Sequence, residues 1–257
     1  MGAVGLLVAV ALALACLVAS GRESFAEQKS AMVIVEPRKH ARLRPTIENF
    51  DKNMPPHYDL YIFHGKSAAA YARRAAANVS RRRKVHYVRL DTDNLTVDGY
   101  NALLKSPREF WDKIDAENVL VFQTDTALCS ASRNRVQDFE HLGYIGCSYD
   151  GTAGKGAAMF GDHAFWGVGG LSFRKKSAAL ECLAKVPHAA TMPEDVFFSD
   201  CVEAGIGARP ANGAQLSEFC TQNTFLARSF GAHRLELMED PRKPAFLEYC
   251  PEASGIA

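Results

Sequence analysis

Short apolar runs alternate with helix-favouring segments along the first half of the chain. Each run has the length of a buried strand and is followed by turn or polar residues. The runs are residues 32–37, 58–63, 85–90 and 118–122. The segments between them favour helix, although Pro107 interrupts the last one: residues 42–53, 68–77 and 98–114. Because strands that alternate with helices pair in parallel, the sequence predicts a layered α/β fold with a mostly parallel central sheet.

The second half of the chain has a less regular pattern. Residues 150–170, DGTAGKGAAMFGDHAFWGVGG, are rich in glycine and predict a loop. The elements expected after it are a strand over 170–173, a helix over 175–185 and a helix that begins at Pro193. We expect a single domain over residues 31–240 with an irregular C-terminal half, and an irregular tail over residues 241–257.

The chain begins with an uncharged apolar segment over residues 2–20, followed by small residues that a signal peptidase accepts. Residues 1–26 therefore predict a signal peptide or an uncleaved signal anchor, and residues 27–30 a connector. Either leader directs the chain to the secretory pathway, in the ER or Golgi lumen or outside the cell, and only an uncleaved anchor attaches it to a membrane. On that route Asn78 and Asn94 are glycosylation acceptors, because each begins an Asn-x-Ser/Thr motif.

Six of the seven cysteines follow the leader: Cys129, Cys147, Cys182, Cys201, Cys220 and Cys250. No Cys-x-x-Cys pair occurs, which argues against a zinc ribbon or a thioredoxin-type site. An even number behind a secretion signal permits disulfides, and free core cysteines stay an open alternative. The sequence does not choose among the possible pairings.

Charge excludes one class of partner. Lys and Arg number 30 and Asp and Glu number 29, so no net basic field points to nucleic acid. The local basic run Arg81–Lys84 could bind an anionic polymer, but we expect a solvated basic turn beside a strand.

Asp125 ends an apolar run, in VLVFQTDTALC over residues 119–129. Ligands of open parallel sheets bind outside the carboxyl ends of the strands. A carboxylate at such an end, next to Gln123 and Thr124, can hold a divalent cation that neutralises a nucleotide diphosphate. The alternative is a helix N-cap, a common position for Asp.

Three further patterns contain residues that could belong to a binding or catalytic site. In Pro193-Glu194-Asp195 both carboxylates fall in the first turn of an expected helix. There the helix dipole stabilises negative charge, or one carboxylate serves as a general base. The glycines of residues 166–170 allow backbone to approach a sugar or phosphate, or form a turn before a strand. His233 is either a metal ligand or an ordinary surface or core histidine.

The order of these blocks resembles a known family. VIVEPR, SPREFWDKI, VLVFQTDTALC, GYIGCSY, GVGGLSFRKKS, PEDVFFS and FGAHR are similar to successive blocks of a glycosyltransferase-like family, domain of unknown function 5672 (DUF5672). The resemblance covers residues 31–235. It also matches the plan of GT-A fold glycosyltransferases, so the expected fold is a single-domain, GT-A-like (Rossmann-like) one.

The resemblance implies a role for each matching residue. Asp125 and His233 would bind a divalent cation, Mn²⁺ or Mg²⁺. Asp195 would be the catalytic base, and Glu194 would contact acceptor or donor hydroxyls. The remaining positions would bind the donor: Gln123 and Thr124 at the ribose, Gly169 and Gly170 at the sugar, and Glu36 and Arg38 at the nucleotide.

The implied function is metal-dependent, inverting transfer of a sugar from a nucleotide-sugar donor, with a UDP-sugar favoured, to a carbohydrate or glycoconjugate acceptor. Two departures weaken this reading. The metal motif is Gln-Thr-Asp rather than Asp-x-Asp, and Val168 stands where the family's glycine loop often has Asn. They favour an alternative, a secreted protein that binds carbohydrate or nucleotide sugar without turnover. A disulfide-stabilised structural protein is a third reading.

Overall fold

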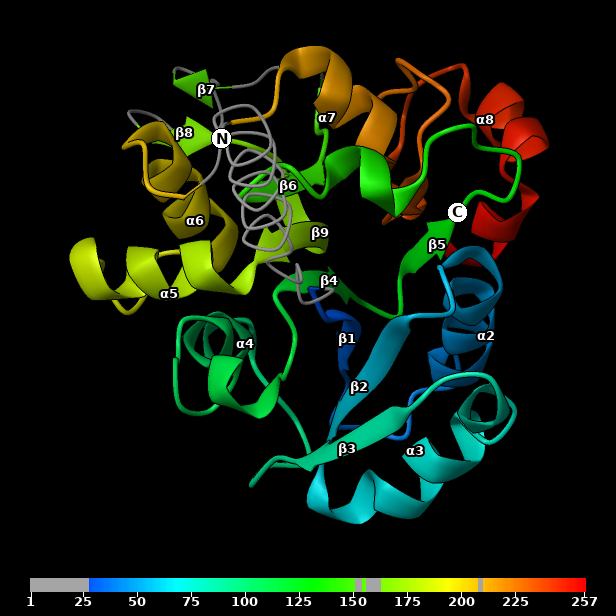
Figure 1. The fold of residues 1–257 in the computed structure, drawn as a ribbon. Coiled ribbons are helices and arrows are strands. Elements are labelled where there is room, and N and C mark those ends of the chain that lie inside the picture. Colours follow the sequence, from blue (N-terminus) through cyan, green and yellow to red (C-terminus); the bar gives the residue numbers. More distant parts are fainter. Residues whose placement is uncertain (1–27, 151–153, 156–162, 208–209) are drawn as a thin grey trace, which may run out of the picture.

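The computed structural model describes residues 28–150, 154–155, 163–207 and 210–257 of the chain (Figure 1). The expected leader over residues 1–26 lies outside this range. The strands of the first half are β1 (Ser30–Val35), β2 (Tyr58–His64), β3 (Val85–Arg89) and β4 (Asn118–Phe122). Its helices are α2 (Leu43–Asn53), α3 (Ala69–Ala75) and α4 (Val97–Leu104), with short 3-10 turns η1 (Lys66–Ala68), η2 (Val79–Arg81) and η3 (Trp111–Lys113).

In the described part of the chain, six strands form the central sheet in the order β3-β2-β1-β4-β9-β6. The first four pair in parallel, and β9 (Val168–Lys175) runs antiparallel to both β4 and β6 (Tyr144–Cys147). The predicted α/β fold with a mostly parallel sheet is confirmed. The four strands predicted in the first half begin and end within two residues of β1 to β4.

Helices cover both faces of this sheet. Figure 1 shows α2 and α3 on one side, and α4, α5 (Lys176–Lys185) and α6 (Glu194–Glu203) on the other. The strands β1 and β4 lie in the middle and are buried along their whole length. A strand with helices on both faces needs apolar residues at successive positions, which explains the continuous runs MVIV and VLVF.

The described parts of the glycine-rich segment 150–170 depart in part from the predicted loop, while residues 151–153 and 156–162 lie outside the described residues. The strand β9 begins at Val168, inside the segment, so Gly169 and Gly170 are strand residues and not loop residues. Two short strands, β7 (Gly154–Lys155) and β8 (Ala164–Phe165), also form there and pair with each other. Glycine inside a strand marks a close approach of another group, and the groups that approach β9 belong to the cavity described below.

A second sheet lies beside the first in the C-terminal half. It contains β5 (Thr126–Leu128), β10 (Cys220–Thr221) and β11 (Gly231–His233), in the order β10-β11-β5. The remaining elements of this half are α7 (Gly213–Phe219), α8 (Lys243–Tyr249), η4 (Val136–Phe139), η5 (Leu235–Leu237) and η6 (Pro251–Ile256).

The expected irregular tail after Pro241 is wrong. Most of these residues are helical, in α8 and η6, and they form a second apolar core with the β5 and β11 strands. Phe246, Ala253 and Ile256 are buried in this core. The tail is too short and too mixed in composition to show the spacing of apolar residues that is typical of a helix. Its helices instead pack against β5 and β11.

All six cysteines of the described residues form disulfides, which settles the alternative that the sequence left open. The pairs are Cys129–Cys250, Cys147–Cys220 and Cys182–Cys201. Disulfides form and persist in oxidising compartments, which agrees with a secreted chain. Within the described residues, no helix has both the length and the apolar composition that crossing a membrane requires.

The basic run at Arg81–Lys84 is not simply a solvated turn. Arg83 is buried, and its Nε lies 2.7 Å from Asp51 Oδ1 on α2. The same guanidinium donates to the main-chain oxygens of Pro55 and Tyr58. Arg83 therefore fixes the loop before β2 to α2, while Arg81, Arg82 and Lys84 are exposed as expected.

Candidate active site

A cavity of about 380 Å³ opens at the carboxyl ends of β1 and β4. The chain adds β2 and β3 on one side of β1 and then places β4 on the other side. The loops after β1 and β4 therefore lead away in opposite directions and leave a crevice between them. Such a reversal of strand order is where open α/β sheets bind ligands.

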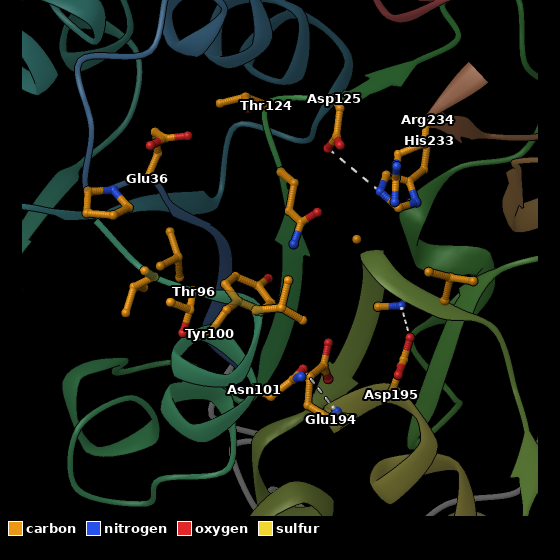
Figure 2. Close-up of a pocket in the computed structure, with 18 of the residues that line it drawn as sticks. Glu36, Thr96, Tyr100, Asn101, Thr124, Asp125, Glu194, Asp195, His233 and Arg234 are labelled. Atoms are coloured by element: carbon orange, nitrogen blue, oxygen red, sulfur yellow. Dashed lines mark hydrogen bonds and ion pairs between the residues drawn. The ribbon is translucent and has the colours of Figure 1, made fainter. Parts of the chain in front are cut away.

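All ten residues predicted for the site line this cavity. Figure 2 shows Asp125 and His233 at one end and Glu194 and Asp195 at the other, with Glu36 at the side. Gly169 and Gly170 of β9 lie between the two ends. The structure thus brings together positions that are up to about 200 residues apart in the sequence, from Glu36 to His233.

Asp125 lies in a turn between β4 and the short strand β5, so its alternative role as a helix N-cap is wrong. Its main-chain oxygen accepts a hydrogen bond from Arg234 N at 3.0 Å, which ties the turn to the end of β11. Its carboxylate oxygen Oδ1 is buried and has no hydrogen-bond partner among the described residues. Burial raises the pKa of this carboxyl group.

His233 faces Asp125 from the end of β11. Its Nδ1–H donates to Gln222 Oε1 at 2.8 Å, which leaves the lone pair on Nε2. Nε2 lies 3.7 Å from Asp125 Oδ1 and, like it, has no hydrogen-bond partner among the described residues (Figure 2). Burial lowers the pKa of His233 to about 3, so the imidazole is neutral at neutral pH and the pair is not a salt bridge.

Asp125 Oδ1 and His233 Nε2 are the two unpaired atoms at this end of the cavity. A buried polar atom without a partner is costly, and here an acceptor lone pair and a carboxylate oxygen face the same point. Imidazole nitrogen and carboxylate oxygen are both ligands of Mn²⁺-type ions. Within the described residues, no group of three or more His, Cys, Asp or Glu side chains meets the geometry of a metal site.

Glu194 is the buried carboxylate of the opposite end. Its Oε2 lies 2.6 Å from Arg174 Nη1, and both side chains are almost fully buried. The Arg174 guanidinium lies over the rings of Tyr144 and Phe198, and its Nε donates to Ser172 Oγ. Burial raises the pKa of Glu194, while Arg174 opposes this shift. Arg174 thus fixes the direction in which Glu194 points into the cavity.

Asp195 is more open than Glu194 and lies at the start of α6. Its Oδ2 accepts a hydrogen bond from Gly169 N at 3.2 Å, and its Oδ1 accepts one from Val196 N at 2.9 Å. Each carboxylate oxygen keeps a further lone pair, and the side chain is only half-buried. A partly exposed carboxylate held by two backbone amides can take a proton from a bound hydroxyl group.

The two strand glycines make room for these side chains. A Cβ atom on Gly169 would overlap the Glu194 carboxylate, and one on Gly170 would overlap the His233 ring. Positions 169 and 170 therefore require glycine, because other side chains of the cavity lie against the backbone there. Whether they also contact a donor sugar, as the resemblance implies, stays a prediction.

Glu36 and Arg38 lie beyond the carboxyl end of β1. Arg38 Nε and Nη2 donate to the two carboxylate oxygens of Glu36 at 2.8 and 2.9 Å, and Arg38 N donates to Oε1 at 2.9 Å. Glu36 is buried, whereas the Arg38 side chain is half exposed. The pair is thus largely self-satisfied, and Arg38 is the member that a ligand reaches.

Several residues of the site are absent from the sequence predictions. Gln222 orients His233, Arg174 orients Glu194, and Tyr100 and Asn101 of α4 line the middle of the cavity. Asn101 Oδ1 also accepts from Glu194 N at 3.3 Å, which joins α4 to the start of α6. Arg174 lies in the block GVGGLSFRKKS without a predicted role, and no quoted block contains the other three residues, because each acquires its role by a contact between distant segments.

Comparison with known proteins fixes the family. The model of a family described as "protein of unknown function (DUF5672)" matches residues 84–233, more than half of the chain. The chain belongs to the DUF5672 family. The match includes the predicted site residues from Gln123 to His233, and it leaves Glu36 and Arg38 outside. No curated protein matches this DUF5672 member.

Two of three solved structures similar to this DUF5672 protein carry the names of glycosyltransferases. One is the apo structure of WbbM, a bifunctional glycosyltransferase, at 10% identity and a TM-score of 0.53, covering 91% of this chain and 51% of that one. Another is mannosyltransferase PcManGT from Pyrobaculum calidifontis in complex with GDP-Man and Mn²⁺, at 15% identity and a TM-score of 0.48, covering 73% of this chain and 56% of that one. A third is S. aureus TarS 1–349, at 10% identity and a TM-score of 0.45, covering 68% and 55%.

The likeness to WbbM confirms the predicted GT-A-like fold of the DUF5672 chain. This chain spans little more than half the length of each of the three structures.

Proposed function

We propose that this DUF5672 protein is a glycosyltransferase that moves a sugar from a nucleotide sugar to an acceptor hydroxyl group. The observation that carries the proposal is the pair of buried, unpaired atoms Asp125 Oδ1 and His233 Nε2, 3.7 Å apart, in the cavity at the strand-order reversal. A cation held between them would face a ligand in the same cavity as Asp195. The fold, which resembles solved glycosyltransferases, agrees with this reading.

The residues that hold the cation in this proposal are Asp125 and His233. A bound Mn²⁺ or Mg²⁺ would supply positive charge to a departing diphosphate. Gln222 keeps His233 in the tautomer that presents Nε2, a supporting role often seen behind metal-binding histidines. Because position 123 is Gln, a side-chain amide stands where a first carboxylate would be in Asp-x-Asp. Ligand oxygens and water would complete the coordination.

Asp195 is the base in this proposal. Its carboxylate accepts the proton of the acceptor hydroxyl while that oxygen attacks the anomeric carbon. One base and one displacement give inversion of the anomeric centre. A positioned base typically contributes about 10²- to 10⁴-fold to the rate.

The remaining cavity residues would bind the donor. Glu194, fixed by Arg174, is suited to accept hydrogen bonds from sugar hydroxyl groups. Arg38, anchored by Glu36, and the segment Gln123-Thr124 lie where the nucleotide would enter, next to the carboxyl ends of β1 and β4. Gly169 and Gly170 would leave room for the sugar.

We further propose that the glycosyltransferase domain predicted over residues 31–240 also includes residues 241–257, which pack in the second apolar core, and that the protein works in the secretory pathway. Three disulfides among the described residues support an oxidising compartment. UDP-sugars are the first donors to test, and the acceptor is a carbohydrate or a glycoconjugate.

A protein that binds nucleotide sugar without turnover is the second candidate. Gln123 favours it, because the missing carboxylate lowers the negative charge that would attract a cation. The two candidates differ in one measurable property, the turnover of the donor.

Turnover of a panel of nucleotide sugars with Mn²⁺, measured as release of the nucleoside diphosphate with and without sugar acceptors, tests the proposal. Asp195→Asn should slow release at least about 10²-fold while donor affinity is kept, because the base acts only on the acceptor proton. The control is Asp112→Asn, which changes an exposed carboxylate outside the cavity. An Asp195→Asn variant as fast as the control would rule out the assigned base, and donor binding without any turnover would favour the second candidate.

A further inference from the structure

Arg234 has an unusual backbone conformation. Its φ of 49° and ψ of 49° place it in the left-handed region, and it is the one non-glycine residue with positive φ among those that the structure describes. An arginine in this region is strained relative to an ordinary backbone conformation. Glycine or asparagine would adopt the same turn with less strain.

The conformation is imposed from both sides. His233 before it is fixed by Gln222, and Leu235 after it is fully buried in the second apolar core. Arg234 N donates to the main-chain oxygen of Asp125, so the backbone must turn within this one residue between β11 and η5. The turn explains the positive φ. It gives no reason for a long cationic side chain at the position.

The side chain of Arg234 has a distinctive place in the charge pattern of the cavity. Among the described residues that line the cavity, the cations are Arg38 and Arg234. Arg38 is bound to Glu36, which also lines the cavity. Arg234 pairs through Nε with Glu236 Oε1 at 3.2 Å, and Glu236 lies outside the lining. Among the described residues, Arg234 is therefore the lining cation that forms its ion pair with a residue outside the lining, although it also interacts electrostatically with Asp125.

The pair with Glu236 is also easily exchanged. Both side chains are 45% exposed, and ion pairs between exposed side chains contribute little to stability. A ligand with two or more phosphate oxygens offers the guanidinium a better partner, because its forked donors match phosphate geometry. Figure 2 shows Arg234 beside His233 and facing the same end of the cavity as Asp125.

We propose that Arg234 binds the diphosphate of a nucleoside diphosphate next to the Asp125–His233 pair. The inference rests on the proposed function, since the ligand is the nucleotide portion of the donor. Arg234 adds a second positive charge beside the cation site, and the left-handed turn holds its side chain at the rim while its backbone fixes Asp125. The same contact would stabilise the charge that develops on the leaving diphosphate.

The test is the affinity of the whole protein for UDP and GDP in the presence of Mn²⁺, measured by titration calorimetry. Arg234→Gly should weaken binding of the nucleotide that the wild type prefers by about 10- to 100-fold, as expected for a charge-assisted contact. Its melting temperature should not fall, because glycine adopts positive φ without strain. Arg133→Ala, which removes an exposed cation outside the cavity, should bind as the wild type does.

Glu236→Gln separates a contact with the ligand from a structural ion pair. It removes the partner of Arg234 and keeps the guanidinium, so diphosphate affinity should be equal to or higher than that of the wild type. An equal loss in Glu236→Gln and Arg234→Gly would overturn the inference, and so would unchanged affinity in Arg234→Gly. If the wild type binds neither UDP nor GDP with Mn²⁺, the proposed function fails together with the inference; if it binds and Arg234→Gly binds equally, only the inference fails.

Discussion

The two halves of the molecule are held together in different ways. The first half, from β1 to β4, has four adjacent parallel strands and no cysteine. Its strands lie in a continuous apolar core that also contains residues of the second half, and the rings of Phe50 and Phe122 stack there with centroids 3.9 Å apart. The second half has strands of two or three residues in its small sheet and carries all three disulfides of the described chain.

The difference teaches how the cavity is supported. The first half presents Glu36, Gln123 and Asp125 at the ends of long buried strands, where position follows from the sheet. The second half presents His233 from β11, a strand of three residues, and Asp195 from the first turn of α6, a helix that the Cys182–Cys201 disulfide joins to α5. Disulfides and the second apolar core take over where the sheet is too short.

The largest expected loss of stability follows removal of the Cys129–Cys250 disulfide. This disulfide joins the segment after β5 to the end of α8. Its sequence separation of 121 residues gives a loop-entropy contribution of about 5 kcal/mol. The Cys182–Cys201 disulfide closes only 19 residues and should contribute about 3 kcal/mol.

Urea unfolding of the two double Cys→Ala variants checks this order, and hydrogen exchange shows where the loss occurs. Exchange should rise at β5, β11 and α8 in the Cys129–Cys250 variant, while β1 and β2 keep their protection. Equal loss of protection in both halves would break the contrast.

A smaller expected effect is that protonation of His233 lowers the free energy of unfolding at acid pH. Its pKa is about 3 in the folded protein and about 6.5 in an unfolded chain, so the unfolded state binds more protons between these values. Stability is therefore full above about pH 6.5 and falls as the pH drops towards 3, by about 2 kcal/mol at pH 5.

The measurement is the free energy of unfolding from pH 7 to pH 5, without added metal, for the wild type and for His233→Asn. The variant should lose less stability over this range by about 2 kcal/mol, because Asn does not titrate. Identical pH slopes would show that His233 is not a buried neutral imidazole.

The contrast also explains what could be predicted from the sequence. The strands of the first half were predicted closely because burial on both faces leaves a continuous apolar run. No such apolar run marks the small strands of the second half or the helix α8. These elements form because of their contacts with other segments of the chain. The sequence predicts the strand from Gly170, whereas β9 already begins at Val168; the side chains that require glycine at 169 and 170, those of Glu194 and His233, lie elsewhere in the sequence.

The candidate site was predictable to a similar extent. The order of short motifs, together with the family resemblance, placed Asp125, Asp195 and His233 in one site, and the structure brings them to one cavity. Gln222 and Arg234 were not predicted, because one is defined by a hydrogen bond to a ring nitrogen and the other by a backbone angle. The disulfide pairs were beyond sequence reasoning, since spacing alone favours none of them.

The central claim is that Asp125 and His233 hold a cation that a nucleotide sugar needs. The most direct measurement is thermal unfolding of the protein with a panel of nucleotide sugars, with and without Mn²⁺, for the wild type and Asp125→Ala. A donor at 100 times its dissociation constant should add about 2.7 kcal/mol. The account predicts that one donor raises the melting temperature only with Mn²⁺ and only when Asp125 is present; stabilisation by a donor that needs neither Mn²⁺ nor Asp125 would contradict it.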